Sequence, residues 1–153
     1  RTAPRSRSAA RATAARRSEC RWLTDVEEAK RLSKSTGKPI LANFSGSDWC
    51  GWCIRMDREV FQTSAFATWA RDNVVLLEVD VPRRGLSAAQ TKKNRALQKR
   101  YAVRGFPTVL FLNADGQVLA RSGYREGGPS AWTKDATAKI RGTPARRTPA
   151  SRR

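Results

Sequence analysis

Two cysteines separated by two residues, Cys50 and Cys53, constrain this chain more than any other feature of its sequence. They follow an apolar run at 39–44 that is typical of a strand, and they precede a helical pattern at 54–61. If Cys50 lies at the first helical turn, unpaired backbone N–H groups and the helix dipole favour its thiolate. Cys53 lies about one turn later on the same face, within reach of a disulfide. Such a pair can attack a substrate disulfide with one sulfur and resolve the mixed disulfide with the other.

Metal and haem sites built on a Cys-x-x-Cys pair need residues that this chain lacks. The chain has three cysteines and no histidine, whereas a zinc site or a four-cysteine iron–sulfur cluster needs four ligands. Haem attachment needs a histidine directly after the second cysteine, where this chain has Ile54. A structural disulfide stays open, although so short a bridge constrains little of the unfolded chain. We expect a redox pair without metal or other cofactor, and the third cysteine, Cys20, as a spare thiol.

The basic charge is concentrated at the two ends of the chain. The formal net charge is +18, but residues 1–18 hold six arginines and residues 141–153 hold five, with no acidic residue in either segment. The rest of the chain holds the other 20 Lys and Arg and all 13 Asp and Glu, so it is much closer to neutral. Both ends have almost no large apolar side chain, which predicts disordered tails around one domain at 19–140. No aromatic residue interleaves the tail arginines, so we expect only non-specific contact with nucleic acid.

The amino-acid composition does not decide in which cellular compartment the protein works. No run of 18 apolar residues could span a membrane, and the first twenty residues lack the apolar segment of a secretory signal. The chain begins with Arg rather than Met, which is compatible with a removed upstream segment. Its Arg-, Ala-, Ser- and Thr-rich start also has the composition of an organelle transit peptide.

The rest of the central segment alternates helical and strand patterns. A capping box of Thr24 and Glu27 predicts the start of the first helix. The expected helices cover about 24–35, 54–61, 63–69, 87–101 and 130–140, and the expected strands cover 39–44, 74–80, 109–112 and 117–122. This order predicts an α/β fold with a mixed sheet and helices on both faces.

A second motif, Gly-Phe-Pro-Thr at 105–108, precedes the third expected strand. With this motif, the Trp-Cys-Gly-Trp-Cys sequence at 49–53 and the order of elements, the chain resembles the thioredoxin-fold family over residues 22–140. The two motifs match the family's Trp-Cys-Gly-x-Cys sequence and its cis-proline loop. The chain is most similar to a bacterial branch with many exported members, which implies an exported or periplasmic location, with the cytoplasm as the alternative.

The resemblance implies a role for each residue of the two motifs. Cys50 would be the nucleophile and Cys53 the buried resolving thiol. Pro107 would follow a cis peptide bond and pack against the disulfide, while the backbone of Phe106 would pair with an extended substrate segment. The other residues expected to contact or position substrate are Trp49, Gly51 and Trp52.

Two departures from the family pattern matter for the mechanism. Asn43 stands where thioredoxins place a buried Asp that takes the proton of the resolving thiol, allowing for one extra loop residue. An amide does not take up a proton near neutral pH. Cys53 would then lose its proton through water, or to Asp48 or Glu59, although solvated charges are the common role for such residues. Trp52 replaces the usual Pro between the cysteines, which leaves the direction of catalysis open.

These features predict a thiol–disulfide oxidoreductase, with a protein-disulfide reductase favoured. It would act on protein disulfides as a monomer and take electrons from an external reductant. The alternatives are an oxidase or isomerase of exported proteins, or a non-catalytic binding module whose basic tails contact nucleic acid or membrane.

Overall fold

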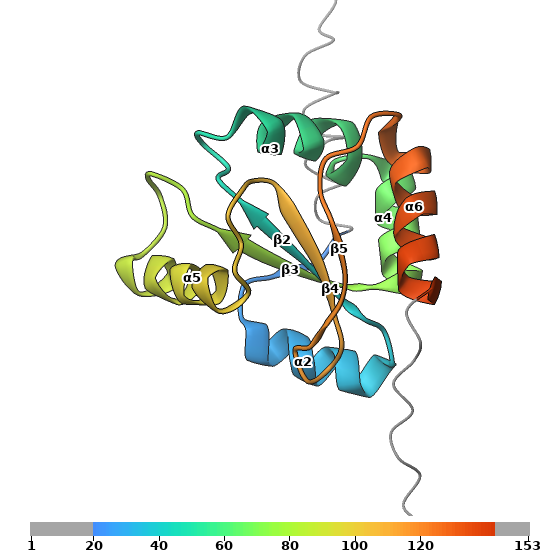
Figure 1. The fold of residues 1–153 in the computed structure, drawn as a ribbon, viewed down its shortest axis with the longest axis horizontal. Coiled ribbons are helices and arrows are strands. Elements are labelled where there is room, and N and C mark those ends of the chain that lie inside the picture. The colour runs from blue at the N-terminus through green and yellow to red at the C-terminus, as the bar shows by residue number, and fades with distance from the viewer. Residues whose placement is uncertain (1–19, 143–153) are drawn as a thin grey trace, which may run out of the picture.

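A five-stranded mixed sheet forms the centre of the protein in a computed structural model that describes residues 20–142 (Figure 1). The strands are β1 (Trp22–Leu23), β2 (Ile40–Ser45), β3 (Val75–Asp80), β4 (Thr108–Leu112) and β5 (Val118–Ser122). The helices are α2 (Val26–Thr36), α3 (Gly51–Met56), the π-helical turn η1 (Asp57–Phe61), α4 (Ser64–Asn73), α5 (Ala88–Arg100) and α6 (Gly128–Gly142). Helix α6 runs two residues past the predicted domain end at 140, and the rest of both predicted tails lies outside the described residues.

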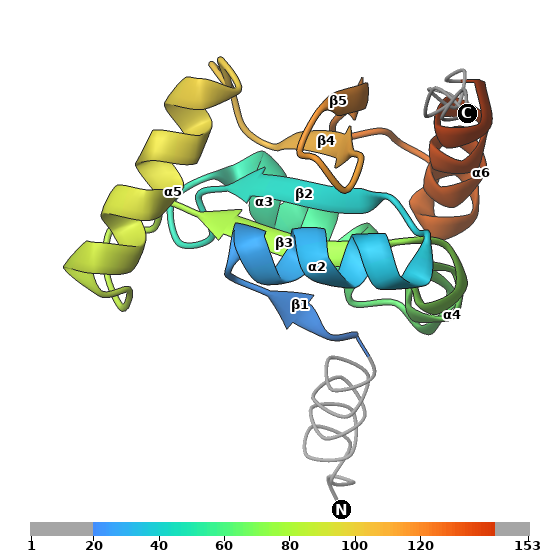
Figure 2. The same cartoon turned by 90° about the horizontal axis from the view of Figure 1, so that it is seen from below.

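Strand β2 lies in the middle of the sheet, whose order is β1-β3-β2-β4-β5. It runs parallel to β3 and antiparallel to β4, and all six of its residues are buried, as a central strand requires. Figure 2 shows the strands in this order, with α2 and α3 on opposite faces of the sheet. The predicted α/β class, with a mixed sheet between helices, is therefore confirmed.

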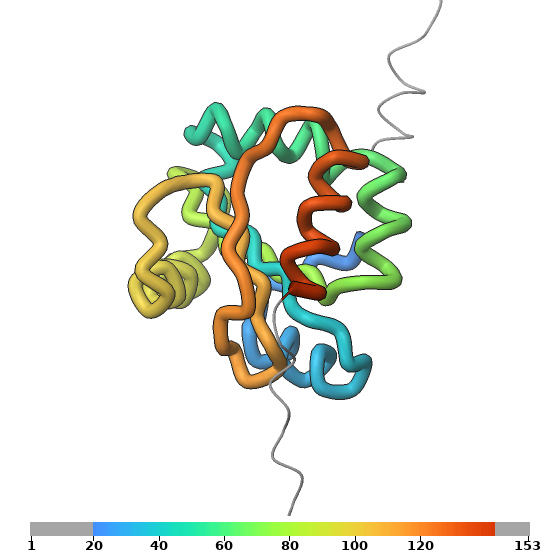
Figure 3. Tube along the Cα trace, turned by 45° about the vertical axis from the view of Figure 1, so that its right-hand side comes forward, coloured from blue at the N-terminus to red at the C-terminus, as the bar shows by residue number. Residues whose placement is uncertain are grey.

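Side chains of β2 alternate between two hydrophobic cores, because successive residues of a strand point to opposite faces. Ile40 and Phe44 pack with residues of α2 and α5, whereas Leu41 packs with η1, α4 and α6. In this second core the fully buried Trp132 of α6 lies edge-on to Phe61 of η1, with 5.6 Å between ring centroids. Figure 3 shows α6 lying beside α4. The helix that begins at the cysteine pair is thus anchored at its far end by aromatic packing.

The N-cap of α2 is Asp25, so the predicted N-cap, Thr24, is wrong. Asp25 Oδ1 accepts a hydrogen bond from the Glu27 N–H at 2.9 Å. The Glu27 side chain, expected to complete a capping box, forms an ion pair with Lys30 at 3.3 Å instead. A carboxylate accepts a hydrogen bond from a helix N–H more strongly than a hydroxyl does, which explains why Asp25 rather than Thr24 caps α2.

Two local features have no counterpart in the sequence-based prediction. Strand β1 adds two residues to the edge of the sheet, parallel to β3, and two residues are too few to form a recognisable pattern. After Met56 the helix widens into η1, where the Gln62 N–H donates to the Asp57 carbonyl, five residues earlier, at 2.8 Å. Such π-helical turns are common near functional sites.

Candidate active site

The two cysteines form a disulfide at the start of α3, directly after the loop that follows β2. Cys50 is the N-cap, with φ −90° and ψ 106°, and its Sγ accepts the Cys53 N–H at 3.2 Å. The Cα atoms of the pair are 5.2 Å apart, and both residues are more than nine-tenths buried. The predicted position of Cys50 at a helix start is thus confirmed. An N–H aimed at this sulfur stabilises negative charge on it.

The loop before Cys50 is closed by a tight turn at Gly46. The Gly46 carbonyl accepts the N–H groups of Trp49 at 3.2 Å and Cys50 at 2.8 Å. A Cβ atom at Gly46 would overlap the indole ring of Trp49. A glycine is therefore required for this packing, and it sets the position of the tryptophan beside the disulfide.

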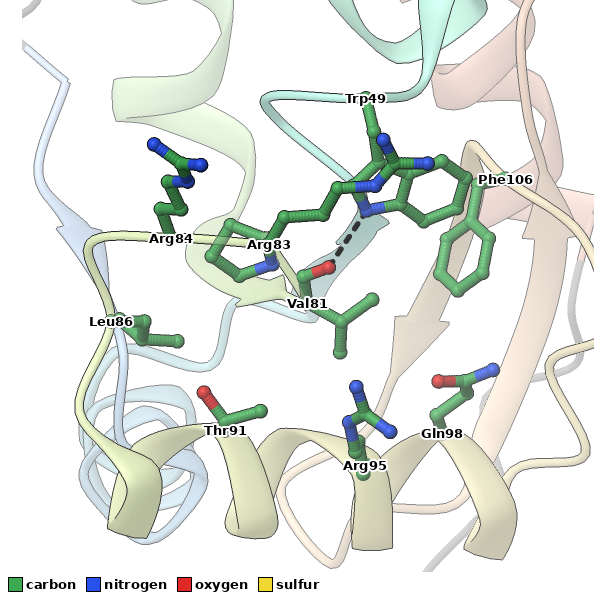
Figure 4. A pocket seen from close by; sticks show the side chains of 10 residues that line it. Trp49, Val81, Arg83, Arg84, Leu86, Thr91, Arg95, Gln98 and Phe106 are labelled. Carbon is green, nitrogen blue, oxygen red and sulfur yellow. Dashed lines mark hydrogen bonds between the residues drawn. The ribbon is translucent and has the colours of Figure 1, made fainter.

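Trp49 connects the cysteine loop to two distant segments. Its indole N–H donates to the Val81 carbonyl at 2.9 Å, as Figure 4 shows, and its ring lies edge-on to Phe106 with centroids 5.5 Å apart. The Phe106–Pro107 peptide bond is cis, as the sequence motif predicted. The cis-proline loop is therefore joined to the cysteine loop through aromatic contact. The substrate-binding roles assigned to Trp49, Phe106 and Pro107 stay predictions.

Trp52, between the cysteines, belongs to a polar and aromatic cluster at the surface. Trp52 is 54% exposed, and its ring centroid lies 5.0 Å from that of Tyr124. The Arg55 guanidinium lies 5.4 Å from both ring centroids. Glu59 accepts hydrogen bonds from Arg55 Nε and from the Tyr124 hydroxyl, both at 2.7 Å. The bond from Arg55, and then that from Tyr124, holds the pKa of Glu59 below its ordinary value. Tyr124 was absent from the predicted site because it is 72 residues from Trp52 in sequence.

Asp48, in the loop before the disulfide, has a structural role. Its carboxylate accepts the backbone N–H groups of Arg83, at 2.9 and 3.1 Å, and Arg84, at 3.1 Å. The bond from Arg83 is the foremost cause that holds the pKa of Asp48 below its ordinary value. A carboxylate with a lowered pKa is a weaker base, so Asp48 and Glu59 are both poorly suited to take a proton from Cys53.

A cavity of about 600 Å³ opens beside Cys53, on the α3 face of the sheet. Asn43, Glu78, Asp57 and Asp80 line it, whereas Asp48 and Glu59 are not among its lining residues. Asn43 is paired with Glu78 across β2 and β3, and its Nδ2 donates to the Glu78 carboxylate at 3.3 and 3.4 Å. Within the described residues, the buried Asn43 Oδ1 has no hydrogen-bond partner. A buried oxygen without a hydrogen-bond donor favours the binding of one at the cavity wall, either a water molecule or a thiol.

Sequence reasoning identified neither Glu78 nor Asp57 as a site residue. Glu78 interrupts an otherwise apolar strand, and a carboxylate inside such a run is the signal that could have identified it. Asp57 fits the outer face of a regular helix, but it is only half-exposed, lines the cavity and accepts a hydrogen bond from the Gln62 side chain. Cys20, expected at the edge of a tail, is buried and lines the same cavity.

No helix within residues 20–142 is long and apolar enough to cross a membrane. In the same part of the chain, no group of three or more His, Cys, Asp or Glu side chains could hold a metal ion.

A cysteine pair at the start of the helix after the central strand, joined to a cis-proline loop, defines the class of thioredoxin-fold redox proteins. The family model of the thioredoxin-like domain matches residues 26–137. The disulfide bond reductase DsbH of Chlamydia pneumoniae is 42% identical over 106 residues, which are 69% of this chain and 64% of DsbH. The chain therefore belongs to the thioredoxin-like family.

Other relatives agree with this assignment. The thiol:disulfide interchange protein DsbD of Ralstonia nicotianae is 37% identical over 94 residues, which are 61% of this chain and 14% of DsbD. A solved structure of a DsbH oxidoreductase has a TM-score of 0.75 and 36% identity, over 80% of this chain and 85% of that one. A thioredoxin from Thermus thermophilus, with a TM-score of 0.61 and 20% identity, shares the fold. The chain spans less than two thirds of the length of the two curated relatives named here.

Proposed function

We propose that the protein is a thiol–disulfide oxidoreductase that reduces protein disulfides through Cys50 and Cys53. The observation that carries this proposal is the Cys50–Cys53 disulfide, in which the Cys50 sulfur accepts the Cys53 N–H at a helix start. Support also comes from the relatives, one of which is named a disulfide bond reductase. A bridge across three residues constrains little of the unfolded chain, so a purely structural role accounts poorly for it.

The catalytic cycle transfers two electrons from the dithiol to the substrate. The Cys50 thiolate attacks one sulfur of a substrate disulfide, and the other substrate sulfur leaves as a thiolate and takes up a proton. The Cys53 thiolate then attacks Cys50 Sγ, which breaks the mixed disulfide and releases the second substrate thiol. The protein is left with the Cys50–Cys53 disulfide, and an external thiol reductant restores the dithiol.

We propose that Glu78 accepts the proton of Cys53 before the second step. Glu78 lines the same cavity as Cys53 and contacts Asn43, which the resemblance to thioredoxins aligns with the family's proton acceptor but which cannot take a proton itself. Asp80 and Asp57 also line this cavity and accept hydrogen bonds from Ser47 and Gln62, whereas Glu78 accepts its hydrogen bonds from Asn43 itself. The proton would pass from Cys53 Sγ through cavity water to a Glu78 oxygen, with Asn43 Oδ1 holding that water.

The proposed activity is tested by reduction of insulin disulfides with dithiothreitol as the electron source. We expect Cys50→Ser to abolish turnover, and Cys53→Ser to accumulate a mixed disulfide at Cys50 that can be trapped by acid. Cys20→Ala is the matched control and should retain turnover, because Cys20 is not part of the disulfide. Equal activity of the Cys50→Ser variant and the wild type would contradict the proposal.

The reduction potential of the pair decides the direction of catalysis. Equilibration in dithiothreitol or glutathione buffers should give a value near about −270 mV for a thioredoxin-like reductant. A value near about −120 mV would support the oxidase alternative, and a pair that stays oxidised far below about −300 mV would support a structural bridge.

We propose that the protein works outside the cytoplasm. Protein disulfides persist mainly in oxidising compartments, so a dedicated disulfide reductase meets its substrates there. A membrane-impermeant maleimide applied to intact cells should label Cys50 after mild reduction, whereas labelling only after lysis would place the protein in the cytoplasm.

A further inference from the structure

A groove of about 680 Å³ lies on the α5 side of the sheet, next to the cysteine loop (Figure 4). Trp49 and Phe106 form its aromatic wall, and the connection from β3 to α5 and the first three turns of α5 form the remainder. Figure 4 shows the Arg95 side chain pointing from α5 into this groove, between Thr91 and Gln98. The groove therefore continues from the cis-proline loop, where a substrate segment is expected to pair, toward α5.

The groove is basic, although the Asp48 carboxylate in the adjacent loop attracts Arg83. Three arginines line it, Arg83, Arg84 and Arg95, and no Asp or Glu is among its lining residues. Within residues 20–142, none of the three guanidinium groups forms an ion pair with a carboxylate. The carboxylate in the adjacent loop, Asp48, is already occupied by the backbone N–H groups of Arg83 and Arg84.

The backbone around the groove is held in place by hydrogen bonds on both sides. The indole of Trp49 fixes Val81, and Asp48 fixes the backbone of Arg83 and Arg84. In the middle of α5, the side chain of the buried Asn94 donates to the Asp80 carbonyl at 2.7 Å. A preformed site loses less entropy on binding than a flexible loop does.

Guanidinium groups favour carboxylates, which they can bind through two parallel hydrogen bonds. We propose that this groove binds an acidic segment of the substrate polypeptide, next to the disulfide that Cys50 attacks. The inference rests on the proposed function, and it adds the substrate class: proteins with Asp or Glu residues near the reducible cysteine. The occupied groove would place the substrate disulfide beside Cys50 and attract acidic substrates from solution.

The test compares disulfide-linked peptides that differ only in acidic or neutral residues flanking the cysteine. For the wild type at low salt, we expect kcat/KM to be about tenfold higher for the acidic peptide, since two or three partly exposed ion pairs contribute modestly each. Added salt should reduce this ratio toward one, because exposed charges are screened. An acidic peptide that is reduced no faster than the neutral one would overturn the proposal.

Two triple variants each remove three positive charges, one from the groove and one from a distant part of the surface. The groove variant is R83Q/R84Q/R95Q, and the control variant, on α2 and at the end of α6, is R31Q/K34Q/R141Q. The groove variant should lose the preference for the acidic peptide while reducing hydroxyethyl disulfide, which is small and uncharged, at the wild-type rate. The control should keep the preference. Equal loss in both variants would show that net charge alone is responsible and would overturn the groove as the site.

A binding measurement separates failure of the groove from failure of the proposed function. The acidic peptide, with its cysteines replaced by serine, should shift the NMR signals of the Trp49 indole N–H and the Arg83 and Arg84 amides in the oxidised protein. The neutral peptide should not shift them. Preferential binding of a short single-stranded DNA of equal charge would overturn the proposal in favour of a phosphate site. Inactivity toward hydroxyethyl disulfide would instead count against the proposed function.

Discussion

The two sides of the disulfide are chemically opposite. On the α3 face, the cavity beside Cys53 is lined by three carboxylates, those of Asp57, Glu78 and Asp80, and by one arginine, Arg58. On the α5 face, the groove beside Trp49 is lined by arginines and by no carboxylate. The two sets of lining residues have no member in common, although the chain passes from one to the other between Asp80 and Val81.

This difference indicates a division of tasks around a single pair of sulfurs. A carboxylate in the cavity beside the resolving cysteine can accept a proton, and guanidinium groups in the groove beside Trp49 can hold an acidic substrate. Because successive residues of a strand point to opposite faces, β3 and the residues after it supply both surfaces from one short stretch. The following predictions test whether the tasks are separate.

The largest effect is expected from Glu78→Gln, which keeps the side-chain size and removes the base. In stopped-flow experiments with a peptide disulfide, the second phase, resolution by Cys53, should slow by about 100-fold at neutral pH. The variant rate should rise more steeply with pH across the neutral range than the wild-type rate, since only solvent base then deprotonates Cys53. Asn43→Asp should partly rescue the variant by placing a carboxylate on the neighbouring strand.

Glu59→Gln is the matched control for this experiment. Glu59 lies in the Trp52 cluster and does not line the cavity, so its loss should leave the resolution phase unchanged. A resolution rate in Glu78→Gln equal to that of the wild type would rule out Glu78 as the base.

A smaller effect is expected from Gly46→Ala, which acts on the groove side. The added Cβ would overlap the Trp49 ring, so we expect a loss of about 1–3 kcal/mol in the free energy of unfolding in urea. Gly51→Ala is the control, because a Cβ there has no atom within 4 Å. Equal destabilisation by both substitutions would show that Trp49 packing is not the cause.

When the cavity and the groove are changed together, we expect only a still smaller deviation from the effects of the separate variants. Glu78→Gln should alter only the resolution phase, and the triple groove variant only the formation of the mixed disulfide with an acidic peptide. In the combined variant each phase should change by the same factor as in its parent, within about twofold, because sites without shared partners act independently. A larger departure would mean that the cavity and the groove are coupled.

The smallest effect concerns the stability of the Trp52 cluster at different pH values. Since the pKa of Glu59 is lowered by Arg55 and then Tyr124, its contribution to stability is present above its unfolded-state pKa. It is lost as the pH falls through the lower folded-state pKa. The melting temperature of the wild type should therefore exceed that of Glu59→Gln slightly at pH 7, and the difference should vanish in acid. A difference that grows in acid would contradict this assignment.

The sequence by itself determined the redox pair, the position of Cys50 at a helix start and the order of strands and helices. These features depend on local patterns, such as apolar runs, N-caps and the spacing of two cysteines. Local reasoning was wrong at the N-cap of α2, where two neighbouring residues could both cap the helix, and it gave no sign that the helix widens at Asp57.

Only the tertiary structure decided what surrounds the two sulfurs. Pairing of β2 with β3 in one register places Glu78 opposite Asn43, and a shift by one residue would have turned that carboxylate to the other face. Contacts between distant segments likewise bring Tyr124 to Trp52, and Val81 and Phe106 to Trp49. Such long-range pairings leave no periodic signal in the chain, so the acidic cavity and the basic groove emerge only once the sheet and its helices are assembled.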